Sequence, residues 1–266
     1  MSKLLWQPSN QRIAAARLTD FQNQVNDQFS LALSSYDDLW QWSIDQPDQF
    51  WDSVCQYLGI EFTQPANKVL QTGAGIRDAR WFEGAKLNFA KQLLKRRDNS
   101  TAIIFRGENG TRRTLSYAEL YQQVAQVQNH LKKMNITAGD RVAGYLPNAP
   151  EAIIAMLATT ALGAVWTSCS PDFGVNGVVD RFGQVEPKLI FTVDGYHYAG
   201  KQINNLDKLP EIVARIPSVE GVIVYPFLND SPDLTEIKGA QLWSEALDDQ
   251  ACDVDFVELP FDHPLY

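Results

Sequence analysis

The feature that most constrains this chain is a regular alternation of strand-like and helix-like segments between residues 101 and 225. The strand-like segments are short runs of β-branched and aromatic residues: RVAGYLP, AVWTSC, KLIFTV and GVIVY. Between them lie segments whose apolar residues recur at helical spacing, such as APEAIIAMLATTALG and VNGVVDRFGQV. Because strands joined through helices pair in parallel, this order predicts an α/β fold with a parallel sheet covered by helices on both faces.

Two local signals mark the start of the alternating region. The segment TAIIFRGENGTRRTLSY predicts two antiparallel strands joined by a turn at Glu108, Asn109 and Gly110. Ser116 and Glu119 form a capping box, in which each side chain bonds to the backbone N–H of the other residue. Apolar residues follow at helical spacing: Leu120, Val124, Val127, Leu131 and Met134. A helix that begins directly after Ser116 is therefore expected.

Residues 10–60 carry helix signals without intervening strands. Ser35 is a candidate N-cap followed by acidic residues, and Pro47 and Gly59 stand where a helix would begin and end. An apolar stripe in this region is expected to form a buried core: Trp40, Phe50, Trp51, Val54, Tyr57 and Leu58. The predicted fold class is therefore a Rossmann-like parallel sheet with flanking helices, preceded by a helical N-terminal extension.

Charge and cysteine content limit the class of function. The formal net charge is −9 and the isoelectric point is about 4.8, which argues against binding to nucleic acid or to an anionic membrane. Cys55, Cys169 and Cys252 are odd in number and far apart, so we expect no disulfide framework and a cytoplasmic location. The most apolar run, residues 152–163, is too short to span a membrane.

One segment imitates a nucleotide-binding loop. In FTVDGYHYAGKQ, Gly195, Gly200 and Lys201 have the spacing of a phosphate loop and directly follow a predicted strand. Gln202, however, stands where such a loop has a Mg²⁺-binding hydroxyl residue. The open interpretations are a nucleotide loop, a solvated lysine after a turn, and a lysine that meets some other phosphate.

No complete catalytic or metal-binding set stands out. His130, His197 and His263 share no ligand spacing with one another or with the cysteines, and the sequence has no G-x-S-x-G nucleophile elbow. We expect His130 to be an exposed helix residue. The sequence therefore predicts no catalytic residue and no metal ligand in this chain.

Several segments, in order, resemble the adenylate-forming acyl-CoA synthetases, and in particular the group of acetyl-CoA and acetoacetyl-CoA synthetases. They are YDDLWQWSIDQPDQFW, RWFEGAKLNFA, LSYAEL and the longer match that begins GDRVAGYLPNAPEAIIAML. Residues 168–188, SCSPDFGVNGVVDRFGQVEPK, are similar to the acetoacetyl branch and lack the Gly-Gly-Phe-Ser-type turn of the acetyl branch. The resemblance covers nearly the whole chain.

The resemblance implies an acid–thiol ligase that converts acetoacetate, ATP and CoA to acetoacetyl-CoA, AMP and pyrophosphate through an acyl-adenylate, with Mg²⁺. It divides the chain into a helical N-terminal extension, residues 1–100, and a partial AMP-binding domain, residues 101–266. The final residues, FDHPLY, are similar to the lead-in to the strand before the family's phosphate loop. We therefore expect the chain to stop before that loop, to be inactive alone, and to associate with a missing C-terminal part or with itself.

The resemblance also implies a coenzyme A contact. Lys201 lies at the position of a basic residue that binds the coenzyme's phosphates in the acetyl branch, while Tyr198 replaces an arginine of that branch. Asp172 and Phe173 match the turn beside the coenzyme. Lys201, Asp172 and Phe173 are thus the expected cofactor-binding residues. The alternatives are a stand-alone, non-catalytic module that binds CoA or a nucleotide, and an inert truncated remnant.

Overall fold

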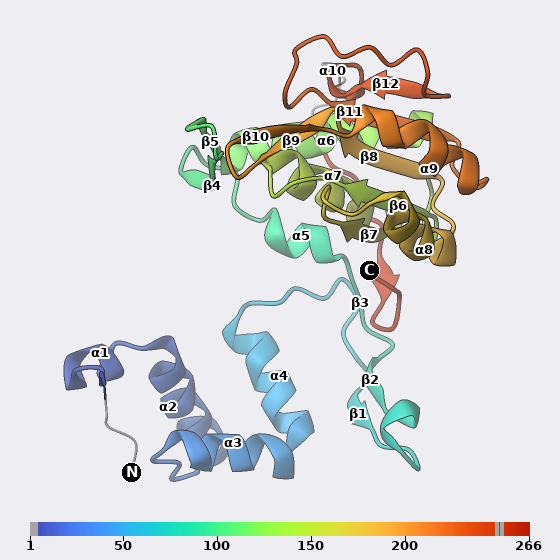
Figure 1. The fold of residues 1–266 in the computed structure, drawn as a ribbon. Helices are drawn as coiled ribbons and strands as arrows, with labels where there is room; N and C mark the ends of the chain where they lie inside the picture. Colours follow the sequence, from blue (N-terminus) through green and yellow to red (C-terminus); the bar gives the residue numbers. More distant parts are fainter. Residues whose placement is uncertain (1–4, 248–249, 251–252) are drawn as a thin grey trace. The chain divides into compact units, whose positions relative to one another are not determined.

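The computed structural model describes residues 5–247, 250 and 253–266, and the chain divides into two units, Met1–Ala85 and Lys86–Tyr266 (Figure 1). The second unit contains a five-stranded sheet in the order β12-β11-β8-β6-β7, in which all neighbours are parallel. Its strands are β6 (Arg141–Tyr145), β7 (Val165–Cys169), β8 (Leu189–Val193), β11 (Gly221–Tyr225) and β12 (Ala240–Leu242). The predicted parallel sheet is confirmed, and β12 is a strand that the sequence did not predict.

Helices cover both faces of this sheet. On one face lie α6 (Tyr117–Lys133) and α7 (Pro150–Ala161), and on the other lie α8 (Val175–Val185) and α9 (Leu209–Arg215) (Figure 1). Successive residues of β8 alternate between these two cores, so Phe191 packs with the first pair of helices and Ile190 with the second. This two-sided burial explains why the strands are apolar at nearly every position.

The local signals at the start of this unit form as predicted. β4 (Thr101–Arg106) and β5 (Arg112–Ser116) pair antiparallel, and Gly110 in their turn has a φ of 83°. The Ser116 hydroxyl accepts a bond from the Glu119 N–H at 3.2 Å, and the Glu119 carboxylate accepts one from the Ser116 N–H at 2.8 Å. The helix signals in the sequence thus fix the first residue of α6.

A buried asparagine ties the start of the second unit to its end. Asn88 caps α5 (Phe89–Leu93), and its side-chain amide also donates to the carbonyl groups of Thr160, Ala161 and Val257, at 3.2, 3.0 and 2.9 Å. Nearby, β3 (Lys86–Leu87) pairs with β13 (Leu259–Pro260). Asn88, the asparagine of RWFEGAKLNFA, therefore has a structural role: it bonds the start of this unit to α7 and to the segment before β13.

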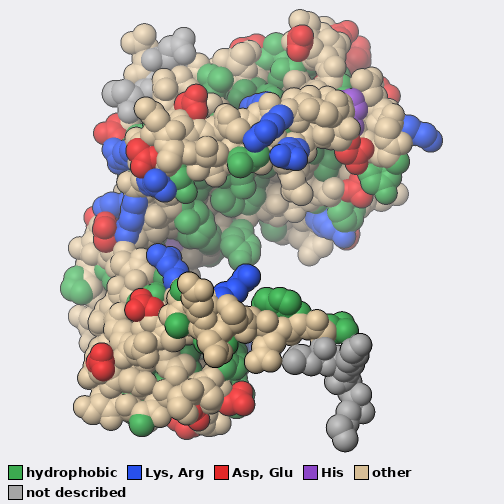
Figure 2. Space-filling model, turned by 90° about the vertical axis from the view of Figure 1, so that its left-hand side faces the viewer, with side chains coloured by type: hydrophobic (Ala, Val, Ile, Leu, Met, Phe, Trp, Pro, Cys, Tyr) green, Lys and Arg blue, Asp and Glu red, His purple; other side chains and the backbone are tan. Residues whose placement is uncertain are grey.

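Several surface features bear on the sequence predictions. Acidic and basic side chains are interspersed over the surface drawn in Figure 2. Among the described residues, no helix is long and apolar enough to cross a membrane. Cys55 and Cys169 are free thiols, and Cys252 lies outside the described residues. The expectation that His130 is exposed is wrong, because it is half-buried with its Nε2 atom 3.0 Å from Gln241 Oε1 in β12.

The first unit combines helices with one antiparallel pair of strands. Its elements are α1 (Asn10–Ala14), α2 (Arg17–Phe29), α3 (Tyr36–Asp45), α4 (Pro47–Tyr57), β1 (Lys68–Gln71) and β2 (Arg80–Glu83). Ser35 caps α3 through a capping box with Asp38, and Pro47 is the first residue of α4, as predicted. The core consists of Phe21, Val25, Leu39 and Trp42.

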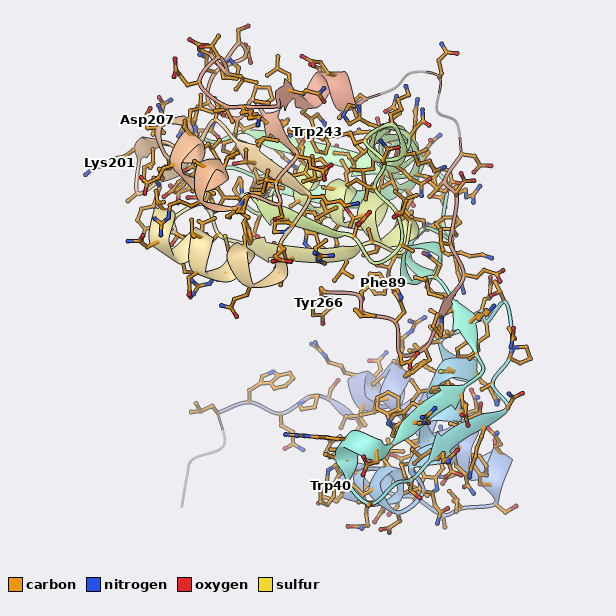
Figure 3. All side chains as sticks on the ribbon, turned by 90° about the vertical axis from the view of Figure 1, so that its right-hand side faces the viewer. Trp40, Phe89, Lys201, Asp207, Trp243 and Tyr266 are labelled. Carbon is orange, nitrogen blue, oxygen red and sulfur yellow. The ribbon has the colours of Figure 1, made fainter. Side chains whose placement is uncertain are left out.

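The apolar stripe predicted for this unit is only half right. Three members pack against the core: Phe50, Val54 and Tyr57. Three others are 51%, 45% and 57% exposed: Trp40 (labelled in Figure 3), Trp51 and Leu58. Trp40 directly follows Leu39, and adjacent helix residues point about 100° apart, so only Leu39 faces the core. Leu58 lies beyond the last residue of α4, as its C-cap.

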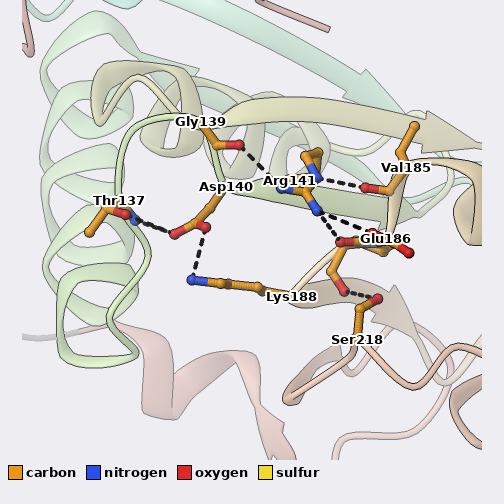
Figure 4. A network of polar contacts seen from close by, with 9 residues as sticks. Thr137, Gly139, Asp140, Arg141, Val185, Glu186, Lys188 and Ser218 are labelled. Atoms are coloured by element: carbon orange, nitrogen blue, oxygen red, sulfur yellow. Dashed lines mark hydrogen bonds and ion pairs between the residues drawn. The ribbon is translucent and has the colours of Figure 1, made fainter.

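A polar network joins the amino ends of β6 and β8 (Figure 4). Lys188 Nζ lies 2.8 Å from Asp140 Oδ1, and Asp140 Oδ2 accepts bonds from the N–H and hydroxyl groups of Thr137. Arg141 Nη2 donates to the Glu186 carbonyl at 3.0 Å. Burial acts to raise the pKa of Asp140, but the bonds from Lys188 and Thr137 outweigh it and lower the pKa. Since ligands bind at the opposite, carboxyl edge of such sheets, this network is structural.

Candidate functional site

The residues predicted to bind the cofactor lie in two connections that follow sheet strands. Asp172 and Phe173 occupy the turn between β7 and α8, and Lys201 begins β10 (Lys201–Asn204), the second strand of a hairpin that follows β8. Both connections leave the sheet at its carboxyl edge. Ligands in open parallel sheets bind at that edge, so the architecture makes these connections the candidate site.

The segment that imitates a nucleotide loop is a β-hairpin. β9 (Gly195–Tyr198) pairs antiparallel with β10, so that Tyr198 stands opposite Lys201. Between them, Ala199 and Gly200 have φ values of 50° and 75°, the left-handed conformation that tight hairpin turns require. A phosphate loop leads into a helix instead, so this geometry excludes the nucleotide-loop interpretation. Lys201 is exposed at the outer end of the hairpin (Figure 3).

A buried carboxylate fixes the base of this hairpin. Asp194, which is 5% exposed, accepts bonds at 2.6 to 3.1 Å from the backbone N–H groups of residues 227–229, in the loop after β11. At Gly195, a Cβ atom would lie 2.4 Å from both the Ile203 carbonyl oxygen and Leu228 Cδ1. Only glycine fits there. The sequence analysis missed Asp194, although an aspartate directly after a buried strand is a detectable signal.

A buried tyrosine holds the turn that carries Asp172 and Phe173. Tyr145, at the end of β6, is 0% exposed, and its hydroxyl lies 3.0 Å from the Pro171 carbonyl oxygen and 2.5 Å from that of Phe173. The hydroxyl has one proton, which these two carbonyl groups share. Burial, followed by the charges of nearby groups that include Asp172, raises the pKa of Tyr145. The hydroxyl therefore remains a donor, and the turn stays in place.

The structure adds a cation that the sequence analysis did not identify. Arg181 of α8 stacks on Phe173, with its Cζ atom 4.1 Å from the ring centre, and its Nη1 donates to the Gly177 carbonyl at 2.9 Å. Burial raises the pKa of Cys169 to about 12, while the charge of Arg181 acts to lower it and that of Asp172 to raise it. The structure thus brings Arg181 to the adjacent residues Asp172 and Phe173, whereas Lys201 lies on the hairpin that follows β8.

The charge of Asp172 in the turn acts on Tyr196 in the hairpin. Burial raises the pKa of Tyr196 in β9, and the charge of Asp172 adds to this effect. Among the described residues, no group of three or more His, Cys, Asp or Glu side chains could hold a metal ion. The hairpin and α8 each present an exposed cation, Lys201 and Arg181, which suits the binding of phosphates.

Comparison with known proteins identifies the family. The model of the AMP-binding enzymes matches residues 89–258, which is well over half of the chain. The chain belongs to the AMP-binding enzyme family. A second model, of the acetyl-coenzyme A synthetase N-terminus, matches residues 36–93.

Individual members of the AMP-binding family resemble the chain along its whole length. Acetoacetyl-CoA synthetase of Xenopus tropicalis is 37% identical over 275 residues, covering 100% of this chain and 41% of that protein. Malonamoyl-CoA synthetase vrtB of Penicillium aethiopicum is 35% identical, covering 99% and 38%. The solved structure of acetoacetyl-CoA synthetase from Streptomyces lividans has a TM-score of 0.91 at 40% identity, covering 99% and 41%.

The chain therefore spans less than half the length of these relatives. The match to the Streptomyces lividans structure confirms the predicted fold class, which is a partial N-terminal domain of an adenylate-forming enzyme, with a parallel sheet and flanking helices. It also confirms the predicted resemblance to the N-terminal part of an acetoacetyl-CoA synthetase.

Proposed function

We propose that this chain forms the N-terminal part of an ATP-dependent acetoacetate–CoA ligase, which makes acetoacetyl-CoA, AMP and pyrophosphate. The observation that carries the proposal is the fold match to the Streptomyces lividans acetoacetyl-CoA synthetase, with a TM-score of 0.91 over 99% of the chain. The Xenopus tropicalis relative carries the same name at 37% identity. ATP and CoA are the cosubstrates in this proposal.

The chemistry of such a ligase explains its need for ATP. A carboxylate is a poor electrophile, because a nucleophile meets a resonance-stabilised anion. Attack of the acid on the α-phosphate of ATP gives an acyl-adenylate and releases pyrophosphate, and the CoA thiol then displaces AMP. The first step brings two anions together, so Mg²⁺ and fixed hydrogen-bond donors must offset their charge. In this proposal, Mg²⁺ is held by one or two carboxylates together with the phosphates of ATP.

In this proposal, the two connections at the carboxyl edge of the sheet contact coenzyme A. Lys201 and Arg181 supply positive charge for its phosphates, and Asp172 and Phe173 form the adjoining turn. The guanidinium of Arg181, which lies over the Phe173 ring, offers the planar recognition that a lone lysine cannot provide. Tyr145 acts as a positioning residue beneath this surface.

The remaining assignments follow from the same proposal. Residues 1–100 form the helical extension and residues 101–266 a partial AMP-binding domain, with the phosphate loop supplied by the remainder. The partners are then the small-molecule acid, CoA, and either a C-terminal part or a second copy of the chain. A cytoplasmic location remains a prediction.

A chimaera tests this function. Residues 1–266 replace the matching segment of the Streptomyces lividans enzyme, and AMP release is measured with acetoacetate, ATP and CoA. We expect acetoacetate-dependent AMP release from the chimaera and no ATP–pyrophosphate exchange from residues 1–266 alone. A folded chimaera without AMP release would contradict the proposal. Tight CoA binding by a chain that cannot complete the enzyme would instead favour the stand-alone module.

A further inference from the structure

A cavity lies in the second unit, on the face of the sheet covered by α6 and α7. Its volume is about 370 Å³, within the range of small-molecule sites. It is lined by Arg113 of β5, Glu119 and three glutamines of α6, Glu151 of α7, Tyr225 of β11, and Trp243 of α10 (Trp243–Ala246) with Leu247 beside it. Arg181 and Phe173 belong instead to α8 and its preceding turn, so the cavity is separate from the coenzyme surface.

Glu151 gives this cavity an unused acceptor. Its side chain is only 2% exposed, and its Oε1 atom lies 2.6 Å from Arg113 Nη2. Its Oε2 atom is buried and has no hydrogen-bond partner among the described residues. Arg113 cannot serve both oxygens as placed, because its Nη1 donates to the Tyr225 hydroxyl at 2.6 Å. A buried carboxylate oxygen without a donor is costly, so the site favours a ligand that brings an N–H or O–H group.

The charges and surfaces of the lining narrow the class of ligand. Glu119 and Glu151 contribute two carboxylates against the single guanidinium of Arg113, which favours a cation. Burial, followed by the charge of Glu151, raises the pKa of Tyr225 to about 12, so this hydroxyl stays neutral at physiological pH. The Tyr225 and Trp243 rings, 6.1 Å apart in an edge-on arrangement, provide apolar and cation-attracting walls.

We propose that this cavity binds a small primary ammonium ion. The ammonium group donates to Glu151 Oε2 and to the carbonyl oxygens of the α6 glutamines, of which Gln126 is 7% exposed. Its alkyl chain lies against Trp243 and Leu247. The site is independent of the coenzyme surface and of the reaction proposed above. A bridging water at Oε2 is the competing explanation, and it predicts no preference for an amine.

Titration with n-butylammonium, against 1-butanol as the neutral isostere, tests the proposal on the chain itself. Binding is followed by NMR shifts of the Trp243 indole N–H at pH 7, where an alkylamine remains protonated, with a pKa of about 10.4 as for lysine. We expect saturable, salt-sensitive binding of n-butylammonium and at least tenfold weaker binding of 1-butanol. Equal binding of the two compounds, or no saturation by the amine, would overturn the proposal.

Substitutions then localise the binding. Glu151→Gln keeps the shape of the side chain and removes its charge, and should weaken n-butylammonium binding at least tenfold. Glu211→Gln, at an exposed carboxylate of α9 paired with Arg215 at 3.2 Å, is the matched control and should leave binding unchanged. If Glu151→Gln unfolds the protein, Gln126→Leu replaces it, with an expected loss of several-fold. Unchanged binding in a folded Glu151→Gln or Gln126→Leu variant would place the amine elsewhere and refute the site.

Discussion

The two units of this protein bury their apolar residues in different ways. In the second unit, β8 is buried at every residue because helices cover both faces of the sheet. In the first unit, the buried core has only four residues. Beside it lies a groove of about 410 Å³, whose lining includes three exposed apolar side chains, those of Tyr36, Trp40 and Leu58. A strand covered on both faces must be apolar throughout, whereas a helix covered on one face also carries apolar residues that remain exposed.

The strongest test of this contrast is Phe191→Ala in β8. Phe191 is 0% exposed, and its ring centre lies 6.3 Å from that of Trp166 and 5.8 Å from that of Trp243. Because packing on both sides prevents collapse into the space left behind, we expect a loss of about 3–5 kcal/mol in the free energy of unfolding. Urea denaturation followed by circular dichroism measures it, and a loss under about 1 kcal/mol would mean that the sheet repacks freely.

Asp194→Ala should produce the next largest effect, at the base of the hairpin. It removes the acceptor for the N–H groups of residues 227–229, and we expect a loss of roughly 2–3 kcal/mol. The matched control is Asp207→Ala, at an exposed carboxylate on the same segment (Figure 3), which should cost under about 0.5 kcal/mol. Equal losses in the two variants would show that the carboxylate of Asp194 does not anchor the hairpin.

The sequence predicted the second unit well because several constraints agree there. The capping box of Ser116 and Glu119, the helical spacing of α6 and the apolar strands all require the same fold. In the first unit, the apolar stripe alone could not show which ring faces the core. Leu39 and Trp40 are both largely apolar, and their relative burial depends on helix packing that the sequence does not encode locally.

For the coenzyme surface, the expected effect is moderate. In the chimaera, Lys201→Glu should weaken CoA binding about tenfold, or about 1.4 kcal/mol, because an exposed attraction becomes a repulsion. Lys238→Glu makes the same change of charge at another exposed lysine of this unit and should leave CoA binding unaltered. ATP–pyrophosphate exchange should hardly change in either variant. Slower exchange with unaltered CoA binding in Lys201→Glu would contradict the assignment of this residue.

A smaller, pH-dependent effect is expected at the amino edge of the sheet. The pKa of Asp140 is lowered in the folded protein, so its contribution to stability is present above the unfolded pKa of about 3.9 and is lost as the pH falls through the folded value. Lys188→Met removes the 2.8 Å ion pair and should cost roughly 1 kcal/mol at pH 7. The two proteins should converge as the pH falls below about 3.9 and through the lower pKa of Asp140 in the folded protein, where this carboxylate becomes protonated. A difference that stays constant as Asp140 becomes protonated would show that packing of Lys188, and not its charge, is responsible.

The site was less predictable than the fold, for a physical reason. Asp172 and Phe173 are adjacent in sequence, but Arg181 lies eight residues beyond Phe173 and reaches its ring only when α8 is formed. Tyr145, at the end of β6, bonds to the same turn. Such a group forms only when β6, β7 and α8 have packed. The unpartnered oxygen of Glu151 is likewise invisible in the sequence, since its burial depends on β5 and β11.

The smallest expected effect returns to the first unit and separates two tryptophans on one helix. Trp40 is 51% exposed and lines the groove, whereas Trp42, two residues along α3, is 7% exposed in the core. Trp40→Ser should therefore change the free energy of unfolding by less than about 0.5 kcal/mol, while Trp42→Ser should cost about 3 kcal/mol or more. Trp40→Ser should also lower light scattering at high concentration, because it reduces exposed apolar area.

A loss above about 1.5 kcal/mol in Trp40→Ser would mean that its ring is buried in solution, by a second copy or another surface. Repeating the measurement at several protein concentrations would separate these cases, since only burial by a second copy makes the loss depend on concentration.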